Sequence, residues 1–463
     1  MLNLSEIEKS TKGKIINGNK NLIPRNYVLD SRDAKEGDFF VPIIGEKVDS
    51  HKFIIDCVNK GIVGFFINSD CAKKDEIISN SLIINKDVCI IEVENAQNAI
   101  YDAAVFNRNK HIDIPIVAIT GSVGKTSTRE MIASVLKTEK NVLVTERNYN
   151  SCIGIPIMLL KLDSQELCVL EAGINSFGEM ELESRLLKPN VAVITNIGTA
   201  HIGIFMTKEN ILAEKIQITN YIREPYKLIV NSDDKLLRGI KNNEKYSVDE
   251  FNINMINYVS QDDEKIEFKT NIYNKEELIT INQIGNHNVY NALCAIKVAE
   301  IFNIKAENIL KGIENYKNFS RRLEKIELDG NIVLIDDTYN ASIDSMKSGL
   351  ITVNNLSSKR KIAVLGDMLE LGERSNEIHE KVGEIFEILN YDILYTLGDA
   401  SKNICRAAKK YINEVVDFNS RDELIENLIR EMKSGDLIYF KASNGMKFNE
   451  IIEKLKEYKK VKE

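Results

Sequence analysis

The sequence predicts a three-domain α/β protein, and three observations support that prediction. The chain has 463 residues, which at roughly 150 residues per domain corresponds to about three domains. Short apolar runs alternate with longer helical patterns, which is typical of strands and helices arranged around mainly parallel sheets. At one point an apolar run, a glycine-bearing turn and a helical pattern follow one another as they do in phosphate-binding loops. We therefore expect several α/β domains, one of which binds a nucleotide.

The composition is that of a globular protein with a sizeable core. Hydrophobic residues make up 43% of the chain and charged residues 28%, which argues against a disordered or fibrous protein. The 61 basic and 69 acidic residues leave a formal net charge of −8. No block rich in Lys and Arg gives the electrostatic footprint of a protein that wraps nucleic acid or sits on an anionic membrane. We expect neither nucleic acid nor an inserted membrane segment among its partners.

The chain ends and the cysteines bear on cellular location. The first ten residues include Glu6, Glu8 and Lys9 and contain no apolar signal-peptide region. The seven cysteines are odd in number and scattered, without a C-x-x-C pair, so neither a disulfide framework nor a zinc site is indicated. We expect a reducing compartment, the cytoplasm.

Eight apolar runs are predicted to be strands. Two further segments, at 246–281 and at 315–320, indicate how the domains are organised along the chain. The region 246–281 combines polar residues with alternating apolar ones, which fits either an antiparallel insertion or a loose connector. Asn315–Ser320 is the candidate linker into the last third, and the predicted domains are 1–107, 108–316 and 317–463. The predicted strands are Ile114–Ile119, Leu167–Leu170, Val191–Thr195, Leu228–Val230, Ile332–Ile335, Ile362–Leu365, Ile393–Leu397 and Leu437–Phe440.

The strongest motif is the sequence TGSVGKTS at residues 120–127, which follows an apolar strand and precedes a helical pattern. A turn of this kind directs backbone N–H groups and the positive end of a helix at one anion. Lys125 would reach the outer phosphates of a nucleotide, and the Thr126 hydroxyl would coordinate Mg²⁺. The loop is a variant, because Ile119 occupies the place of the first Walker A glycine. A turn that merely joins strand to helix would not need Lys-Thr at the helix start, so we predict nucleotide binding.

Two polar residues follow neighbouring predicted strands at the edge where this loop lies. Glu171 follows the strand that ends at Leu170, and ligands gather at the carboxyl edge of open α/β sheets. Glu171 is the expected Mg²⁺ partner of Thr126. His201 follows the strand that ends at Thr195, but a single imidazole is an atypical ligand for Mg²⁺. Taken alone, His201 is therefore interpreted as a structural histidine.

The run 120–126 resembles the ATP-binding loop of the Mur ligases, the amide-bond-forming ligases of peptidoglycan synthesis. Further resemblances follow in the family's order over nearly the whole chain. The resemblance implies an N-terminal domain that binds a UDP-sugar substrate, a central P-loop ATPase-type domain, and a Rossmann-like C-terminal domain that binds the amine substrate and closes on ATP. It also implies two Mg²⁺ ions as cofactors, and we expect a monomer.

The resemblance also implies roles for individual residues. Glu171 and His201 match the positions that hold the metal nearest the reacting carboxylate, and Lys215 matches a lysine that CO₂ carbamylates into a ligand for a second Mg²⁺. Arg322 matches an arginine that faces the phosphates across the cleft. The implied sets are catalytic Lys125, Lys215 and Arg322; nucleotide-binding Gly121, Ser122, Val123, Gly124, Lys125, Thr126, Ser127, His287, Asn288, Asn291, Asp337 and Tyr339; metal-binding Thr126, Glu171, His201 and carbamylated Lys215; and substrate-binding Ser31, Asn148 and Asn150.

Each of these residues has a simpler interpretation when it is taken alone. Lys215 fits a solvated helix lysine, and Arg322 fits a surface arginine. Asn150 fits a turn residue. Asn288 fits a helix cap. The order of the motifs along the chain favours the functional interpretation.

Within the family, the chain resembles most closely the member that adds D-alanyl-D-alanine. Asp30-Ser31-Arg32 is similar to the uridine-diphosphate-sugar domain of two members, and Gly366–Gly372 is similar to a segment of the dipeptide-adding one. The Asn-Pro-Arg signature of the third-residue ligase is missing. The implied reaction is ATP-dependent addition of D-alanyl-D-alanine to UDP-N-acetylmuramoyl tripeptide through an acyl phosphate. Two departures are Arg147, where glycine is frequent, and the run Lys441–Asn444, where Lys-Gly-Ser-Arg is common.

Three alternatives come from other classes. A folylpolyglutamate-type or cyanophycin-type ligase shares the ATP chemistry but does not need the uridine-type segment. A nucleotide switch or mechanical ATPase would hydrolyse ATP without an acceptor amine. A paralogue could ligate another amino acid or amine, or act only as a binding protein.

Overall fold

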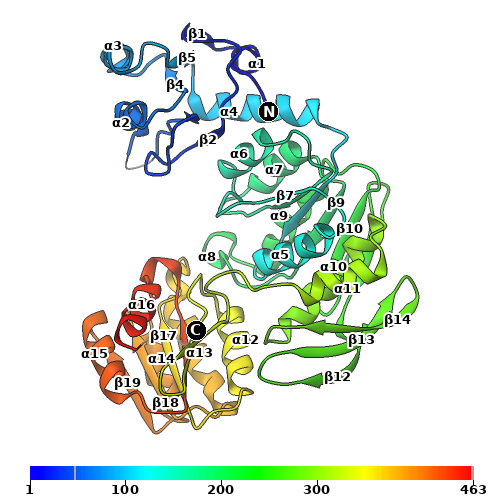
Figure 1. Ribbon diagram of the computed structural model, residues 1–463. Helices are drawn as coiled ribbons and strands as arrows, with labels where there is room; N and C mark the ends of the chain where they lie inside the picture. Colours follow the sequence, from blue (N-terminus) through cyan, green and yellow to red (C-terminus); the bar gives the residue numbers. More distant parts are fainter. Residues whose placement is uncertain (46–47, 460–463) are drawn as a thin grey trace.

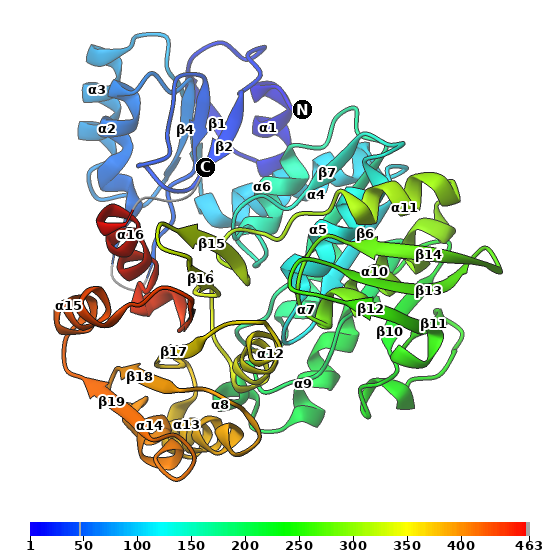
Figure 2. The same ribbon diagram turned by 60° about the horizontal axis from the view of Figure 1, so that its bottom comes forward.

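The computed structural model describes residues 1–45 and 48–459. Three parts follow one another along the chain, each with its own sheet, and they surround a common centre (Figures 1 and 2). Nearly all neighbouring strands in the three large sheets are parallel, because helical crossovers connect them. The predicted α/β class is confirmed.

The N-terminal part is built on a five-stranded sheet. Only the edge strand β1 runs antiparallel to its neighbour, and the other pairs are parallel. The strand order is β1 (Lys14–Asn17), β5 (Cys89–Val93), β4 (Gly64–Asn68), β3 (Asp38–Phe40) and β2 (Asn26–Val28). The helices are α1 (Leu4–Thr11), α2 (Ile54–Asn59) and α3 (Lys74–Ile84).

One long helix, α4 (Ala96–Lys110), leads from this part into the next. It packs on α1 and on α6 (Gly154–Leu160). Arg108, near its end, is fully buried. The Arg108 guanidinium donates to the carbonyl oxygens of four residues, which are Leu187, His111, Ile114 and Lys188. The end of α4 is therefore anchored in the central part, and the predicted border at 107 and 108 falls inside a helix.

The central part is built on a six-stranded, fully parallel sheet. The residues of β6, which carries the phosphate loop, are all buried, and this explains its continuous apolar sequence. The strand order is β11 (Ser247–Phe251), β10 (Lys227–Asn231), β9 (Val191–Ile194), β6 (Ile116–Thr120), β8 (Leu167–Glu171) and β7 (Val142–Val144). The helices are α5 (Lys125–Leu136), α6, α7 (Glu179–Leu187), α8 (Ile202–Phe205), α9 (Lys208–Lys215), α10 (His287–Ile301) and α11 (Ala306–Glu314).

The region 246–281 differs in part from both sequence interpretations. Its first strand, β11, pairs in parallel with β10 and extends the central sheet. The rest forms an antiparallel sheet of β12 (Asn257–Gln261), β13 (Ile266–Ile272) and β14 (Lys275–Ile281). The antiparallel insertion therefore begins about ten residues later than the predicted region, because partner choice at a sheet edge depends on distant residues.

The C-terminal part follows the loop at 315–320 and contains a second six-stranded sheet. Its edge strand β15 is antiparallel to β16, and the other pairs are parallel. The strand order is β15 (Glu324–Leu328), β16 (Ile332–Asp336), β20 (Asp436–Lys441), β17 (Arg360–Gly366), β18 (Ile393–Leu397) and β19 (Glu414–Phe418). The helices are α12 (Ile343–Asn354), α13 (Ser375–Glu384), α14 (Lys402–Ala408), α15 (Arg421–Glu431) and α16 (Asn449–Tyr458). All eight predicted strands are present, with ends shifted by at most a few residues.

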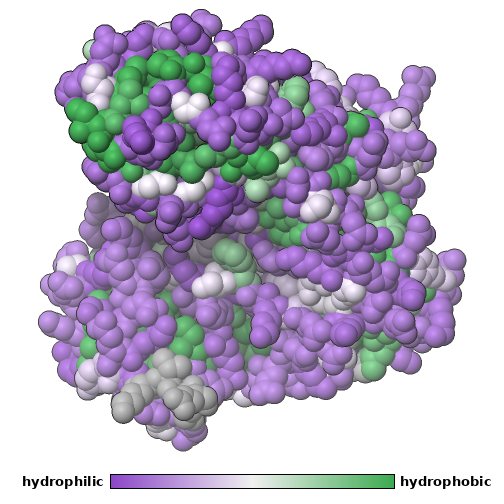
Figure 3. Space-filling view, turned by 45° about the horizontal axis from the view of Figure 1, so that its top comes forward, coloured by the Kyte–Doolittle hydropathy of each residue, from purple (hydrophilic) through white to green (hydrophobic). Residues whose placement is uncertain are grey.

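The face of the molecule shown in Figure 3 is mainly hydrophilic, with an apolar area on its upper part and a recess below it. Among the residues that the structure describes, no helix has the length and apolarity needed to cross a bilayer. The seven cysteines are free thiols.

Candidate active site

The phosphate loop connects β6 to α5 and is shaped by neighbouring strand ends. Gly121 has φ of +147°, and a Cβ built there would lie 2.0 Å from the Thr195 Oγ1 atom, so only glycine fits. The Val123 N–H donates to Asn196 Oδ1 at 3.0 Å, and Thr195 Oγ1 donates to the Val123 carbonyl at 2.7 Å. The residues after β9 therefore hold the loop in shape.

Lys125 begins α5 and bends back across the loop. Its Nζ atom donates to the Gly121 carbonyl at 2.8 Å. Burial lowers the pKa of Lys125, and the nearby Glu171 carboxylate opposes that shift. The ammonium group therefore lies inside the loop, where an anion would replace the carbonyl as its partner.

Thr126 and Glu171 place hard oxygen atoms beside the loop. Thr126 Oγ1 donates to Glu171 Oε2 at 3.3 Å, and Asn150 Nδ2 donates to the same oxygen at 3.3 Å. Glu171 Oε1 accepts from Arg129 Nη1 at 2.7 Å, and both of these side chains are almost fully buried. One carboxylate oxygen is thus neutralised by Arg129, while the other has only long contacts.

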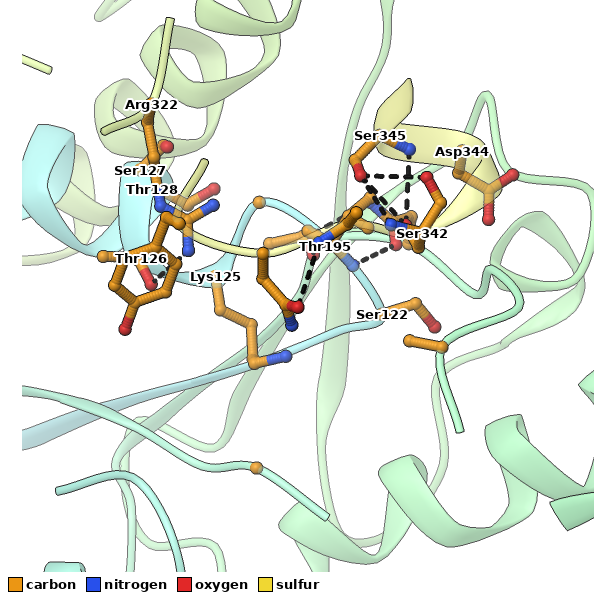
Figure 4. A pocket seen from close by; sticks show the side chains of 18 of the residues that line it. Ser122, Lys125, Thr126, Ser127, Thr128, Thr195, Arg322, Ser342, Asp344 and Ser345 are labelled. Carbon is orange, nitrogen blue, oxygen red and sulfur yellow. Dashed lines mark hydrogen bonds between the residues drawn. The ribbon is translucent and has the colours of Figure 1, made fainter. Parts of the chain in front are cut away.

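Arg322 reaches this group from beyond the linker. Its Nη2 atom donates to Thr126 Oγ1 at 3.1 Å, and its guanidinium lies 4.4 Å from the centre of the Tyr339 ring. Figure 4 shows Arg322 beside Thr126, with Lys125 on the same loop. Cations from two different parts of the chain therefore face one small volume.

His201 lines the cavity at the end of the loop that follows β9. Its Nδ1 atom lies 3.4 Å from Glu370 Oε2 of the C-terminal part. Burial, assisted by the Lys125 and Lys215 cations, lowers the pKa of His201 to about 4. The ring is therefore neutral near pH 7 and has a nitrogen lone pair available for a ligand.

Lys215 lies at the end of α9 and is 2% exposed. Its Nζ atom donates to Thr120 Oγ1 at 3.3 Å. Burial, with a smaller contribution from the Lys125 cation, lowers the pKa of Lys215 well below its usual range. It is a buried lysine beneath the phosphate loop, which excludes the solvated-lysine interpretation.

The start of α10 adds a set of amide side chains behind the loop. Thr128 Oγ1 donates to Asn291 Oδ1 at 2.8 Å, and Asn291 Nδ2 donates to Asn288 Oδ1 at 3.1 Å. Asn288 is buried and donates to the Ile284 carbonyl. His287 lies at the cavity wall, and burial lowers its pKa to about 4.

On the C-terminal side, Asp337 follows β16 and is tied to β20. Its Oδ2 atom accepts from Lys441 Nζ at 2.6 Å and from the Tyr439 hydroxyl at 2.9 Å. Lys441 is buried, and burial lowers its pKa, although Asp337 opposes the shift. This buried pair forms part of the cavity wall.

The first turn of α12 contacts the loop after β9 directly. Asp344 Oδ2 accepts from Thr199 N at 3.0 Å and from Thr199 Oγ1 at 3.2 Å. A Cβ at Gly198 would lie 2.5 Å from the same Asp344 oxygen, so this approach requires glycine. Gly198 N donates to Ser122 Oγ of the phosphate loop at 2.8 Å. Besides the Arg322 contact, the C-terminal part is therefore linked to the phosphate loop through the segment Gly198–Thr199 (Figure 4).

These groups surround one cavity of about 770 Å³. Four of the predicted residues are not among those that line it. Gly121 and Asn288 lie behind the wall, Lys215 is buried below it, and Ser31 belongs to the N-terminal part. Predicted residues that line it are Ser122, Val123, Gly124, Lys125, Thr126, Ser127, Asn148, Asn150, Glu171, His201, His287, Asn291, Arg322, Asp337 and Tyr339.

Ser31 lies near a contact between the N-terminal and central parts. Its carbonyl oxygen accepts from Lys60 Nζ at 2.6 Å. Asp33, two residues later, pairs with Arg147, which lines the cavity. The predicted uridine segment is thus joined to the cavity wall by an ion pair.

The cavity residues that were not singled out from the sequence as site residues include Arg147, Arg321, Asp344 and Lys441. Lys441 directly follows the predicted strand Leu437–Phe440, so its position at a carboxyl edge was a usable signal. The other three depend on contacts across the cavity and have no local sequence signature.

The oxygen donors fit Mg²⁺. Within residues 1–45 and 48–459, no group of three or more His, Cys, Asp or Glu side chains could enclose a metal ion. Thr126 and Glu171 supply two hard oxygens side by side, and Mg²⁺ commonly takes one or two protein oxygens together with substrate phosphates and water.

The fold and the site define a nucleotide-binding α/β protein in which a phosphate loop faces an arginine from a second sheet. The Mur ligase middle domain matches residues 119–299, and the Mur ligase glutamate ligase domain matches residues 321–444. A UDP-N-acetylmuramoyl-tripeptide–D-alanyl-D-alanine ligase of Bacillus subtilis is 31% identical over 98% of both chains. The chain belongs to the Mur ligase family.

Solved structures agree with this assignment. MurF from Acinetobacter baumannii is 26% identical, covers 98% of both chains, and superposes with a TM-score of 0.82. MurF ligase from Thermotoga maritima, solved in complex with ADP, is 25% identical, covers 95% of this chain and 99% of its own, and has a TM-score of 0.79. The similarity includes the N-terminal part, which lies outside the two matched domains.

Proposed function

We propose that this chain is an ATP-dependent ligase that joins D-alanyl-D-alanine to the free carboxylate of UDP-N-acetylmuramoyl tripeptide, a step of peptidoglycan precursor synthesis. The observation that carries the proposal is the match over 98% of both chains to a ligase of that name. A folylpolyglutamate-type or cyanophycin-type ligase would not require similarity across the N-terminal part. We place the reaction in the cytoplasm and propose that the enzyme acts as a monomer.

The chemistry follows from the poor reactivity of a carboxylate. ATP transfers its γ-phosphoryl group to the tripeptide carboxylate, and ADP leaves. The amine of the dipeptide attacks the acyl phosphate, which forms the amide bond and releases phosphate. Lys125 Nζ contacts the Gly121 carbonyl and Arg322 Nη2 contacts Thr126 Oγ1 of the same phosphate loop, so they would stabilise the charge of the phosphoryl group in transfer.

Magnesium would be held by Thr126, Glu171 and His201, and when bound it would neutralise phosphate charge and orient the reacting oxygens. Lys215 would contribute after carbamylation, in which its neutral amine attacks CO₂ and loses a proton. Its burial supports this step, because the lowered pKa favours the neutral amine. A carbamate is an oxygen ligand of the kind that Mg²⁺ prefers.

The other roles are assigned by position. We assign the loop 121–127 to the phosphates, and His287, Asn288 and Asn291 to the adenine side of ATP. Asp337 and Tyr339 are assigned to the ribose or phosphate, Ser31 to the uridine nucleotide, and Asn148 and Asn150 to the tripeptide substrate. The ranges 1–107, 108–316 and 317–463 are the proposed substrate, ATP and ligase domains.

The test is phosphate release from ATP and Mg²⁺ with the UDP-tripeptide and D-alanyl-D-alanine, omitting each component in turn, with mass spectrometry of the product. We expect release only when all components are present, together with formation of the pentapeptide nucleotide. Release without the dipeptide would instead indicate an ATPase, and release only with another amine would indicate a ligase of different specificity.

A further inference from the structure

Arg321 lies next to Arg322 but points to a different part of the cavity. Arg322 reaches the phosphate loop at Thr126. The Arg321 guanidinium instead reaches the segment after β20, where its Nη2 atom donates to Asn444 Oδ1 at 3.1 Å. Both arginines line the cavity. Two consecutive residues therefore place guanidinium groups at different ends of it, one at the phosphate loop and one at the C-terminal sheet.

The Arg321 side chain is fixed rather than free. Its Nε atom donates to Thr338 Oγ1 at 3.0 Å, and its Nη2 atom also donates to the Thr338 carbonyl at 2.5 Å. Thr338 is 1% exposed and donates in turn to Asp336 Oδ1 at 2.6 Å. This chain of hydrogen bonds orients the plane of the guanidinium before any ligand arrives.

The backbone at Arg321 is held in an unusual conformation. Its φ is +64°, a region that side chains other than glycine occupy at a cost. Its N–H donates to Glu324 Oε2 at 2.8 Å, and its carbonyl accepts from Tyr339 N at 3.1 Å. Both ends of the residue are thus fixed.

The positive charge of Arg321 has only neutral atoms as direct partners. Its three hydrogen-bond acceptors are a hydroxyl, a carbonyl and an amide oxygen. In the part of the chain that the structure describes, the Arg321 side chain forms no ion pair, and its hydrogen bonds use only the Nε and Nη2 atoms. An oriented guanidinium with a free edge in a cavity is suited to a carboxylate or phosphate oxygen.

Apolar and small residues lie beside this cation. Leu369, a cavity residue, is 46% exposed. A Cβ added to Gly445 would lie 2.9 Å from Leu369 Cδ1. Gly445 directly follows Asn444, the residue that Arg321 contacts. A ligand bound here therefore meets positive charge on one side and a small apolar surface on the other.

We propose that Arg321 binds the terminal carboxylate of the incoming dipeptide, with Leu369 and Gly445 accommodating its methyl side chains. This inference rests on the proposed function, because the dipeptide is its acceptor substrate. The dipeptide enters with its amine toward the acyl phosphate and its carboxylate away from the phosphate loop, which is the direction in which Arg321 points. Arg321 is thereby a specificity residue for an acceptor that ends in a carboxylate.

The test compares D-alanyl-D-alanine with D-alanyl-D-alaninamide, whose carboxylate is replaced by a neutral amide. For the unaltered enzyme, we expect the KM of the amide to be about 10- to 100-fold higher, since a hydrogen bond to a charged group contributes about that factor. In Arg321→Gly, we expect the KM of the acid to rise to that of the amide, so that the ratio falls to about 1. The KM for ATP should change by less than about twofold in the same variant.

Arg321→Gly also separates binding from folding, because glycine relieves the positive φ. Arg321→Lys should give an intermediate KM ratio, since it keeps the charge without the planar fork. The matched control is Arg430→Gln on α15, where the guanidinium is 70% exposed, and it should leave both KM values unchanged.

The outcomes separate this inference from the proposed function. If the unaltered enzyme makes no product with D-alanyl-D-alanine, the proposed function fails. If it does make product but Arg321→Gly keeps the ratio of acid to amide, the assignment of Arg321 is wrong. A rise in the KM for ATP alone would mean that Arg321 binds a phosphate oxygen, which would also overturn the assignment.

Discussion

Two buried ion pairs contribute carboxylates to the cavity wall, one in the central part and one in the C-terminal part, and they are built differently. In the central part, Glu171 Oε1 pairs with Arg129 at 2.7 Å, while Oε2 has only contacts of 3.3 Å with Thr126 and Asn150. In the C-terminal part, a single oxygen of Asp337 accepts from both Lys441 at 2.6 Å and the Tyr439 hydroxyl at 2.9 Å.

Glu171 therefore has a carboxylate oxygen that can bind a ligand, whereas the Asp337 carboxylate neutralises a buried cation. Arg129 also pairs with Glu130, so its charge does not depend on Glu171 alone. Lys441 has Asp337 as the only ion-pair partner found among the described residues. We therefore expect substitution of Glu171 to affect chemistry more than stability, and substitution of Asp337 to affect both.

The largest expected effect is a loss of turnover when Glu171 is replaced by glutamine. The amide keeps the shape of the side chain but removes the negative charge that would hold Mg²⁺, so we expect kcat to fall by about a thousandfold. Thermal unfolding should change only slightly, because Glu130 still pairs with Arg129. The matched control is Glu130→Gln, which leaves Glu171 in place and should keep most of the turnover. A Glu171→Gln enzyme with nearly normal kcat would contradict the assignment of Glu171 as the carboxylate that acts in the reaction.

The second effect is on stability in Asp337→Asn. Lys441 would remain buried without a carboxylate, and removal of one partner of a buried pair costs about 3 kcal/mol. Urea unfolding measures this loss. The double variant Asp337→Asn with Lys441→Met removes the unpaired charge and should recover a large part of it. If the single variant is as stable as the unaltered protein, the pair does not stabilise the C-terminal part.

A third effect concerns the contact that joins the two regions. Asp344→Asn would weaken the two bonds that Thr199 donates, and the loop that carries His201 would lose its support from α12. We expect kcat to fall by about tenfold through misplacement of the reacting groups. The KM for ATP should change little, because the phosphate loop keeps its own hydrogen bonds. Asp399→Asn, on the exposed surface, serves as the control.

The smallest effect is a pH dependence caused by His287. Burial lowers its pKa from 6.5 to about 4. Below pH 6.5 the unfolded chain therefore takes up a proton at His287 that the folded protein does not. The free energy of unfolding falls for this reason as the pH drops from 6.5 to 4. Above pH 6.5, His287 makes no contribution to the pH dependence of stability.

Urea unfolding at pH 7 and pH 5 would measure this dependence. We expect His287→Gln to reduce the loss of stability by about 1 kcal/mol, a value discounted because the ring is partly exposed. An identical pH dependence in both proteins would show that His287 is protonated in the folded state.

The features that the sequence predicted correctly depend on neighbours along the chain. The strand at 116–120 is a continuous apolar run, and the phosphate loop follows it directly. Glu171 and His201 lie at the expected edge because parallel strands end there together. Local patterns were enough for the fold class and for the position of the phosphate loop after its strand.

The features that were missed depend on contacts between residues that are far apart in the sequence. Nothing in the order of residues indicates that Arg129 neutralises Glu171, or that Asp344 meets Thr199, which is 145 positions away. The parallel pairing of β11 was missed because an edge strand can pair with several partners. The family resemblance singled out Lys215, but no local pattern indicated its burial, since burial of a single lysine is decided by packing around it.

The two junctions between the parts of the molecule differ in stiffness. The first is the helix α4, whose end is anchored by the buried Arg108. The second is the loop at 315–320, which has no regular secondary structure. The N-terminal and central parts should therefore behave as one rigid body, and the C-terminal part should move relative to it. Any change in the width of the cavity would then be a rotation about a single hinge, next to Arg321 and Arg322.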